Sequence, residues 1–232
     1  MRTYTRVDLE DYLRDDWIKY LIEQNVEEPE KKIRTNQWLT EMDNKRLIYA
    51  DVYGDILCEK TSKKVLDVGG GYNALTKVLA ANSSYTLLDF LAHGGSEYLV
   101  KTALQNHINW LREDWYELAE IEDYDVIIAN DIFPDVDQRM ELFIEKMLPH
   151  CHELRLTVTY YNKPCFYTTK RMDDSEIMTF LSWDGEITAM KLKKYESRCN
   201  VYKGEINTMI NFTDSIYRNG RHVSYIIIRG DL

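Results

Sequence analysis

Apolar and polar residues follow two different periods along this chain of 232 residues. In residues 1–62 apolar side chains recur every three or four positions, as Leu9, Leu13 and Trp17 do, and this spacing predicts helices. From residue 63 on, short apolar runs alternate with stretches of helical spacing. The pattern therefore predicts a helical extension, 1–62, followed by an α/β domain, 63–232.

Five apolar runs in the second part have the length of buried strands. They are residues 63–68, 85–90, 107–114, 124–131 and 154–161. Helical patterns separate them, and the one at residues 135–148 begins with Asp135 and Gln138, which are spaced as a capping box. Strands that alternate with helices form a parallel sheet with right-handed crossovers.

The last part of the chain carries a different signal. Asn219-Gly220 lies between two strand-like runs, and this dipeptide is typical of a tight β-hairpin. Together with the five earlier strands, the hairpin predicts an α/β fold with a seven-stranded sheet. That sheet is mostly parallel and finishes with a C-terminal antiparallel hairpin.

Unusual residues gather where the predicted strands end. They are Asp67, Gly69, Gly70, Gly71, Asp89, Asp114, Asn130 and Asp131. In parallel α/β sheets, ligands bind at the carboxyl ends of the strands. A run of three glycines lets a ligand come close to the backbone, at a cost in conformational order. We therefore expect a ligand site at this edge.

The glycine run fits two cofactor motifs. "GGGYNA" matches the dinucleotide pattern G-x-G-x-x-A, with Asp89 about twenty residues after it, and so fits an NAD-dependent oxidoreductase. The same segment matches D-x-G-x-G through Asp67, Gly69 and Gly71. The Asp67 carboxylate would repel a pyrophosphate but would attract a positively charged ligand. Charge therefore favours the second motif.

This D-x-G-x-G segment resembles the first motif of the class I S-adenosylmethionine-dependent methyltransferases. "REDW" at 112–115 resembles the adenine site of that family, and the terminal hairpin resembles the antiparallel end of its Rossmann-like sheet. The resemblance covers about residues 63–165. It departs at Asn73, where the family often has a third glycine, although asparagine tolerates a left-handed conformation.

The resemblance implies S-adenosylmethionine as cofactor, S-adenosylhomocysteine as product, and a role for each residue at the strand ends. Asp67, Gly69, Gly70 and Gly71 would face the methionine moiety. Asp89 would accept hydrogen bonds from the ribose hydroxyls, with Phe90 beside it. Asp114 and Trp115 would contact adenine, and Asn130 would lie beside the sulfonium. The helices of 1–62 would cover the cofactor as a lid.

Transfer to a hydroxyl requires a base and a binding site for the acceptor. We expect Asp131 to be the base or the acceptor anchor, with His93 as second candidate. The other predicted substrate-binding residues are Tyr49, Tyr53, Tyr160, Tyr161 and Arg171. Asp131 and Asp135 could hold Mg²⁺, but helix capping is the preferred interpretation of Asp135, so we assign no metal ligand.

One missing motif and one further resemblance limit the choice of acceptor. Ile132, Phe133 and Pro134 follow Asn130-Asp131, so the N/D-P-P-Y/F motif of nucleobase amine methylases is absent. "RLTVTYYNKPCFYTTKR" resembles methyltransferases that occur among bacterial surface-polysaccharide genes. This implies O-methylation of a sugar or nucleotide-linked sugar. An N-methyltransferase of a small amine and a non-catalytic cofactor-binding subunit stay open as alternatives.

Charge and cysteine content limit the partners. The net charge is -10, and residues 65–150 hold 15 acidic against 5 basic residues, which argues against a nucleic-acid partner. No apolar run is long enough to span a membrane, and the charged N-terminus is unlike a signal peptide, so we expect a cytoplasmic protein. The four cysteines form no CxxC pair and are expected to be free thiols. The oligomeric state stays open.

Overall fold

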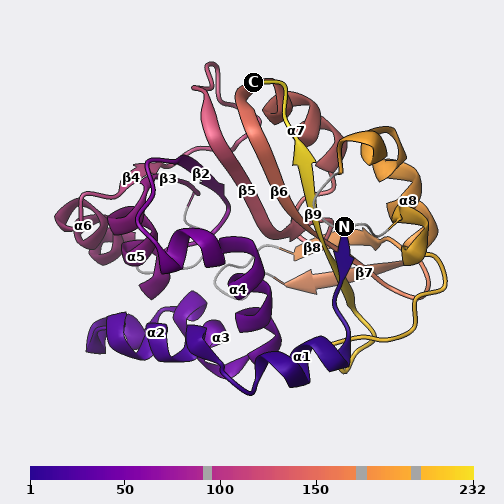
Figure 1. Ribbon diagram of the computed structural model, residues 1–232, viewed down its shortest axis with the longest axis horizontal. Coiled ribbons are helices and arrows are strands. Elements are labelled where there is room, and N and C mark those ends of the chain that lie inside the picture. The colour runs from indigo at the N-terminus through magenta and orange to yellow at the C-terminus, as the bar shows by residue number, and fades with distance from the viewer. Residues whose placement is uncertain (91–95, 171–176, 200–204) are drawn as a thin grey trace.

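The computed structural model describes residues 1–90, 96–170, 177–199 and 205–232 (Figure 1). A seven-stranded sheet in these residues has the order β1-β9-β6-β5-β2-β3-β4. Its strands are β1 (Arg2–Thr3), β2 (Lys64–Val68), β3 (Ser84–Leu88), β4 (Asn109–Leu111), β5 (Tyr124–Phe133), β6 (Cys151–Tyr160) and β9 (His222–Arg229). The strands from β6 to β4 are parallel, whereas β9 is antiparallel to both β6 and β1. The predicted seven-stranded, mostly parallel sheet is confirmed.

The predicted hairpin across Asn219-Gly220 is wrong in its pairing. Residues 210–221 form turns and irregular backbone, and β9 pairs with β6 and with the N-terminal β1. The first seven residues of β9 are all buried, and the strand lies inside the sheet between β6 and β1. An antiparallel hairpin does occur earlier in the chain, between β7 (Cys165–Lys170) and β8 (Ile177–Ser182), as a separate two-stranded sheet.

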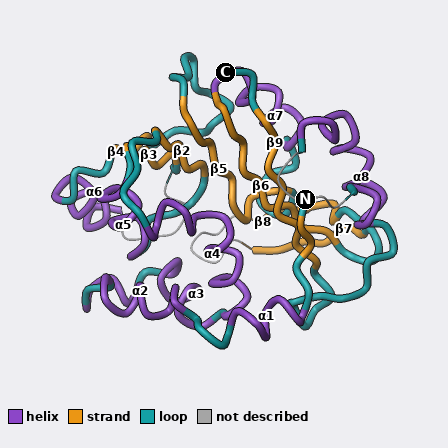
Figure 2. Tube along the Cα trace, in the orientation of Figure 1, coloured by secondary structure: helices purple, strands orange, loops and turns teal. Residues whose placement is uncertain are grey.

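Helices cover both faces of the main sheet (Figures 1 and 2). One face packs against the N-terminal helices and against α5 and α6, and the other packs against α7 and α8. The N-terminal helical segments are α1 (Arg6–Tyr12), α2 (Trp17–Asn25), η1 (Glu28–Lys32), α3 (Arg34–Glu41) and α4 (Asp43–Cys58). The later ones are α5 (Ala74–Asn82), α6 (Ser96–Gln105), α7 (Met140–Met147), η2 (Leu148–His150), α8 (Gly185–Leu192), η3 (Lys193–Arg198) and η4 (Ile206–Met209).

The N-terminal extension is helical as its spacing predicts, but Arg2–Thr3 add an edge strand to the sheet of the second part. The division of the chain at residue 62 therefore stays a prediction. All four cysteines are free thiols, as expected. Within the described residues, no helix combines the length and the apolar character needed to cross a bilayer.

A buried arginine holds the extension together. The Arg46 side chain of α4 is 2% exposed and binds both carboxylate oxygens of Asp16, at 2.8–3.1 Å. Its guanidinium also donates to the carbonyl oxygens of Leu39 and Thr40, at 2.8 and 2.9 Å. One side chain thus joins the start of α2, the end of α3 and α4.

Replacing Arg46 by alanine should lower the free energy of unfolding by about 3 kcal/mol, because Asp16 loses its paired cation and two carbonyl groups lose a donor. Urea denaturation of the purified protein measures this change. Arg14→Ala is the control, because the Arg14 side chain is 79% exposed and pairs with Asp11 on the surface. Similar losses in the two variants would contradict the interpretation of Arg46.

Candidate functional site

The glycine run forms a tight loop between β2 and α5. Gly69 and Gly71 have φ angles of 67° and 63°, in the left-handed region that favours glycine. A Cβ atom at Gly69 would lie 2.6 Å from Ile132 Cδ1, and one at Gly70 would collide with the Asp67 carboxylate. The loop therefore needs glycine for backbone conformation and for close approach.

Asp67 lies beneath this loop. Its side chain is buried and accepts hydrogen bonds from Tyr53 Oη (3.0 Å) and Tyr85 Oη (2.6 Å). Burial raises the pKa of Asp67 to about 7; the two phenols oppose this rise and the nearby Asp89 adds to it. The two oxygens of Asp67 each accept a phenol hydrogen bond, so this residue supports the loop from below.

Asp89 lies beside the loop, just after the end of β3. Its Oδ2 accepts a hydrogen bond from the Gly71 amide at 3.1 Å, and its carbonyl accepts one from Trp110 Nε1 at 2.9 Å. Phe90 follows with half of its side chain exposed. The structure thus brings the predicted ribose acid to the glycine loop. His93 lies outside the described residues.

Asp114 and Trp115 are less favourably placed for adenine. Strand β4 ends at Leu111, earlier than the sequence predicts, and Asp114 pairs with Arg139 at 3.1 Å. Trp115 is 5% exposed, donates from Nε1 to Asp137, and packs its ring edge-to-face on Phe143 at 5.1 Å. Its ring belongs to the core beneath α7, which speaks against the predicted adenine contact of Trp115.

Asp131 lies at the carboxyl end of β5, where the pairing with β6 shifts register. Its φ angle is 60°, and its carboxylate binds both Lys45 Nζ and Arg221 Nη2. Burial alone would raise the pKa of Asp131, but these two cations hold it far below its usual range. A carboxylate with so low a pKa is a weak general base. The contacts favour the anchoring role of Asp131 over the predicted base.

Asp135 occupies the same cluster with weaker partners. Its oxygens accept long hydrogen bonds from Tyr161 Oη (3.3 Å) and Tyr167 Oη (3.4 Å), and Arg221 Nε lies 3.4 Å away. Burial raises the pKa of Asp135; Arg221 opposes this rise, and Asp131 adds to it. Of the two carboxylates, Asp135 is therefore the better proton acceptor.

The predicted capping box is wrong. Helix α7 begins at Met140 with Arg139 as its N-cap residue, and Asp135 contacts tyrosines instead of the helix. Among the described residues, no group of three or more His, Cys, Asp or Glu side chains is arranged to hold a metal ion.

The other predicted residues separate into two groups. Asn130 is buried and its Oδ1 accepts a hydrogen bond from Thr157 at 2.8 Å; Tyr161 reaches Asp135. In contrast, Tyr160 is 1% exposed and stacks on His222, away from the cluster. Successive side chains at the end of β6 point to opposite faces of the sheet, so only one of the two tyrosines, Tyr161, reaches the site.

The two predicted tyrosines of α4 lie under and beside the glycine loop. Tyr53 is fully buried and donates to Asp67, so it supports the loop and does not face an acceptor. Tyr49 stacks on Tyr53, with ring centroids 4.8 Å apart, and its hydroxyl lies 3.5 Å from the Gly70 carbonyl oxygen. Arg171 lies outside the described residues.

Several site residues were missed by the sequence analysis. Lys45, Tyr167 and Arg221 reach the Asp131 and Asp135 cluster from α4, from β7 and from the residue before β9. Asn73 also differs from expectation, because its φ of −151° is extended and its side chain caps α5. No local sequence signal identifies the first three residues, since each looks like an ordinary surface charge or strand residue.

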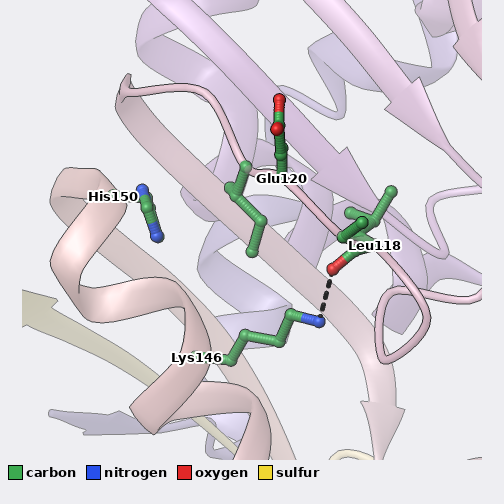
Figure 3. A pocket seen from close by; sticks show the side chains of 6 residues that line it. Leu118, Glu120, Lys146 and His150 are labelled. Atoms are coloured by element: carbon green, nitrogen blue, oxygen red, sulfur yellow. Dashed lines mark hydrogen bonds between the residues drawn. The ribbon is translucent and has the colours of Figure 1, made fainter.

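A surface hollow lies at the opposite edge of the sheet (Figure 3). It has a volume of about 480 Å³ and is lined by Leu118, Ala119, Glu120, Ile121, Lys146 and His150. Lys146 Nζ donates to the carbonyl oxygens of Tyr116 and Leu118 there, at 2.7 and 2.8 Å. None of the predicted site residues lines this hollow, so we assign it no role.

Comparisons with known proteins identify the fold. No protein-family model and no curated protein sequence matches the chain. A solved structure of coclaurine N-methyltransferase bound to N-methylheliamine and SAH is 16% identical, with a TM-score of 0.51 over 97% of this chain and 92% of that one. The DhpI–SAH complex is 12% identical, with a TM-score of 0.51 over 96% and 99% of the two chains. The chain therefore has the Rossmann-like fold of S-adenosylmethionine-dependent methyltransferases.

The raised pKa of Asp67 predicts a pH dependence of stability. The folded protein holds a proton that the unfolded chain releases near its ordinary pKa of 3.8, so the resulting stability is lost as pH rises towards 7. Between pH 5 and pH 8 the free energy of unfolding of the wild type should fall by about 2 kcal/mol more than that of Asp67→Asn. Urea denaturation at both pH values measures the loss. The exposed Asp15→Asn is the matched control, and a wild-type loss no larger than that of Asp67→Asn would contradict the assignment.

Proposed function

We propose that this protein is an S-adenosylmethionine-dependent methyltransferase that acts on a small-molecule acceptor in the cytoplasm. The observation that carries the proposal is the glycine loop at the carboxyl edge of the sheet, with the Asp89 carboxylate bonded to the Gly71 amide. The methyltransferase fold supports it, because a ligand site in such a sheet lies at this edge.

The residues around the loop fit this cofactor. The loop has no side chains at Gly69, Gly70 and Gly71, so its peptides can approach a ligand closely. An aspartate at the end of β3 can accept hydrogen bonds from two ribose hydroxyls. The Asp89 carboxylate beside the loop suits a positively charged donor and disfavours the pyrophosphate of NAD. S-adenosylmethionine supplies a methyl group on a sulfonium, which is a good leaving group.

The protein must then place the acceptor, exclude water and accept a proton. We assign the proton to Asp135, because Asp131 is held by Lys45 and Arg221 and stays ionised. Asp131 in turn holds Lys45 and Arg221 at the carboxyl end of β5. Tyr161 and Tyr167 surround Asp135 with phenol groups that can orient a polar acceptor.

For the acceptor we propose a hydroxyl of a sugar or of a nucleotide-linked sugar. Support comes from the phenols of Tyr161 and Tyr167 at one weakly paired carboxylate, and from the ring of Tyr217, which lies against the Arg221 guanidinium. Aromatic faces with polar tips suit such ligands. The same group of tyrosines and acids would also suit a small amine. N-methylation is therefore the second candidate, and a protein of similar fold is an N-methyltransferase.

The identity of the cofactor is tested by isothermal titration calorimetry with S-adenosylhomocysteine (SAH) and, separately, with NAD. We expect SAH to bind, and Asp89→Ala to weaken it by at least about tenfold, because a charged hydrogen-bond acceptor is lost. Asp15→Ala, an exposed aspartate of the extension, should leave the affinity unchanged. Binding of NAD without binding of SAH would exclude the methyltransferase.

The acceptor is tested by methyl transfer from labelled S-adenosylmethionine to nucleotide-sugars, phenols and amines. With a hydroxyl acceptor, Asp135→Asn should lower kcat by about 10²–10⁴ and remove the rise of rate with pH, since the base is lost. Asp131→Asn should act mainly on KM, because it frees Lys45 and Arg221. Unchanged SAH affinity of both variants is the control. Turnover of amines alone would select the second candidate, and a base role for Asp131 would appear as the larger loss of kcat.

A further inference from the structure

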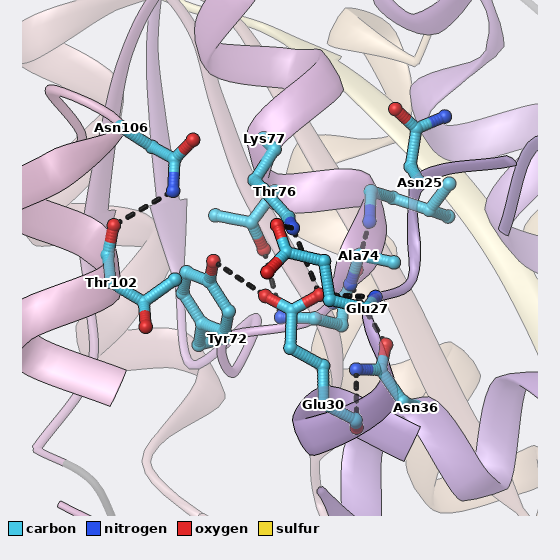
Figure 4. A network of polar contacts seen from close by, with 12 residues as sticks. Asn25, Glu27, Glu30, Asn36, Tyr72, Ala74, Thr76, Lys77, Thr102 and Asn106 are labelled. Atoms are coloured by element: carbon cyan, nitrogen blue, oxygen red, sulfur yellow. Dashed lines mark hydrogen bonds and ion pairs between the residues drawn. The ribbon is translucent and has the colours of Figure 1, made fainter. Parts of the chain in front are cut away.

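A buried carboxylate lies outside the strand-end residues, in the N-terminal extension. Glu30 of η1 is 0% exposed, and its oxygens accept hydrogen bonds from Tyr72 Oη (3.2 Å) and Lys77 Nζ (2.8 Å) (Figure 4). Tyr72 directly follows the glycine loop, and Lys77 belongs to α5. A buried carboxylate is costly unless it is paired, so this contact fixes the extension to the loop in one arrangement.

Two further residues of the extension form hydrogen bonds with the backbone of residues 72–74. Asn36 is 1% exposed; its Oδ1 accepts from the amide of Ala74 at 2.8 Å, and its Nδ2 donates to the Glu30 carbonyl at 3.0 Å (Figure 4). Thr35 Oγ1 donates to the Tyr72 carbonyl at 2.5 Å. The extension therefore satisfies backbone groups on both sides of the point where the loop turns into α5.

The contact reaches the glycines themselves. A Cβ atom at Gly71 would lie 2.8 Å from Thr35 Cγ2, so the extension packs directly on this glycine. On its other side, the Gly71 amide donates to Asp89. Gly71 is thus held between Thr35 of the extension and the acid at the end of β3.

A second connection runs through aromatic rings. The ring of Tyr72, whose hydroxyl is bonded to Glu30, stacks on Trp110 with centroids 6.1 Å apart. Trp110 Nε1 in turn donates to the carbonyl oxygen of Asp89. The loop and Asp89 are therefore tied to the extension by two sets of contacts, one through the backbone and one through side chains.

We propose that Glu30, Thr35 and Asn36 are positioning residues that hold the glycine loop in its cofactor-binding conformation. Docking of segment 28–41 on the loop and binding of the cofactor are then coupled, and each strengthens the other by the same factor. This inference rests on the proposed function. It assigns part of the cofactor affinity to residues outside the sheet and its strand ends.

The test measures SAH affinity and the thermal stability of the ligand-free protein for Asn36→Leu in the full chain. Asn36→Leu keeps the volume but removes both hydrogen bonds, and it should weaken SAH about tenfold. Asn36→Asp keeps the acceptor for the Ala74 amide but loses the donor to the Glu30 carbonyl, so it should restore only part of the affinity. Asn25→Leu is the matched control, because Asn25 bonds only to the Leu21 carbonyl of its own helix among the described contacts.

The outcomes separate the inference from the proposed function. A wild type that does not bind SAH refutes both. A wild type and a folded Asn36→Leu that bind SAH equally refute the inference alone, even if the variant melts at a lower temperature, since that result shows a structural role only.

Hydrogen exchange of the wild type provides a test that needs no variant. Coupling predicts that SAH slows amide exchange in residues 28–41 as well as in the loop, because the ligand favours the docked arrangement. Slower exchange in the loop with no change in residues 28–41 would overturn the inference. This measurement decides the question if Asn36→Leu does not fold.

Discussion

The close approach of the glycine-loop peptides to two carboxylates is the constraint on which the candidate site depends. Asp67 lies directly beneath Gly70, and Asp89 accepts a hydrogen bond from the Gly71 amide. A side chain at Gly69 or Gly70 would break this packing, and the left-handed backbone of Gly69 and Gly71 would be strained. The burial that raises the pKa of Asp67 follows from the same packing. The extension then secures the loop from outside, through Thr35 and Asn36.

At the acceptor end of the site, the neighbouring side chains give the two aspartates Asp131 and Asp135 different roles. Asp131 and Asp135 lie four positions apart, yet one has its pKa lowered and the other has it raised. Both are partly buried, which favours the neutral acid. Two cations reverse this effect at Asp131, whereas Asp135 has long contacts with phenols and shares Arg221. The number of charged partners decides which acid can take a proton.

The alternation of strands and helices from β2 to β6 could be predicted, because burial imposes a period on each segment by itself. The carboxyl ends of these strands lie at one edge of the sheet, as the parallel order in the sequence analysis predicts. The hairpin at Asn219-Gly220 failed because a turn signal does not reveal that β9 lies between β6 and β1. The surroundings of Trp115 could not be predicted for a similar reason: a residue after a strand can face a ligand or the core, and here its ring packs on Phe143 of α7. Its contact with adenine stays a prediction.

The sequence by itself determined the α/β architecture and the glycine loop with its acids at the strand ends, since periodicity, glycine conformation and residue type are local properties. Only the tertiary structure decided which partners those residues have. Lys45 and Arg221 reach Asp131 from distant parts of the chain, and Glu30 reaches Tyr72 from the extension. Hydrogen bonds and pKa shifts depend on such neighbours in space, which no short stretch of sequence records.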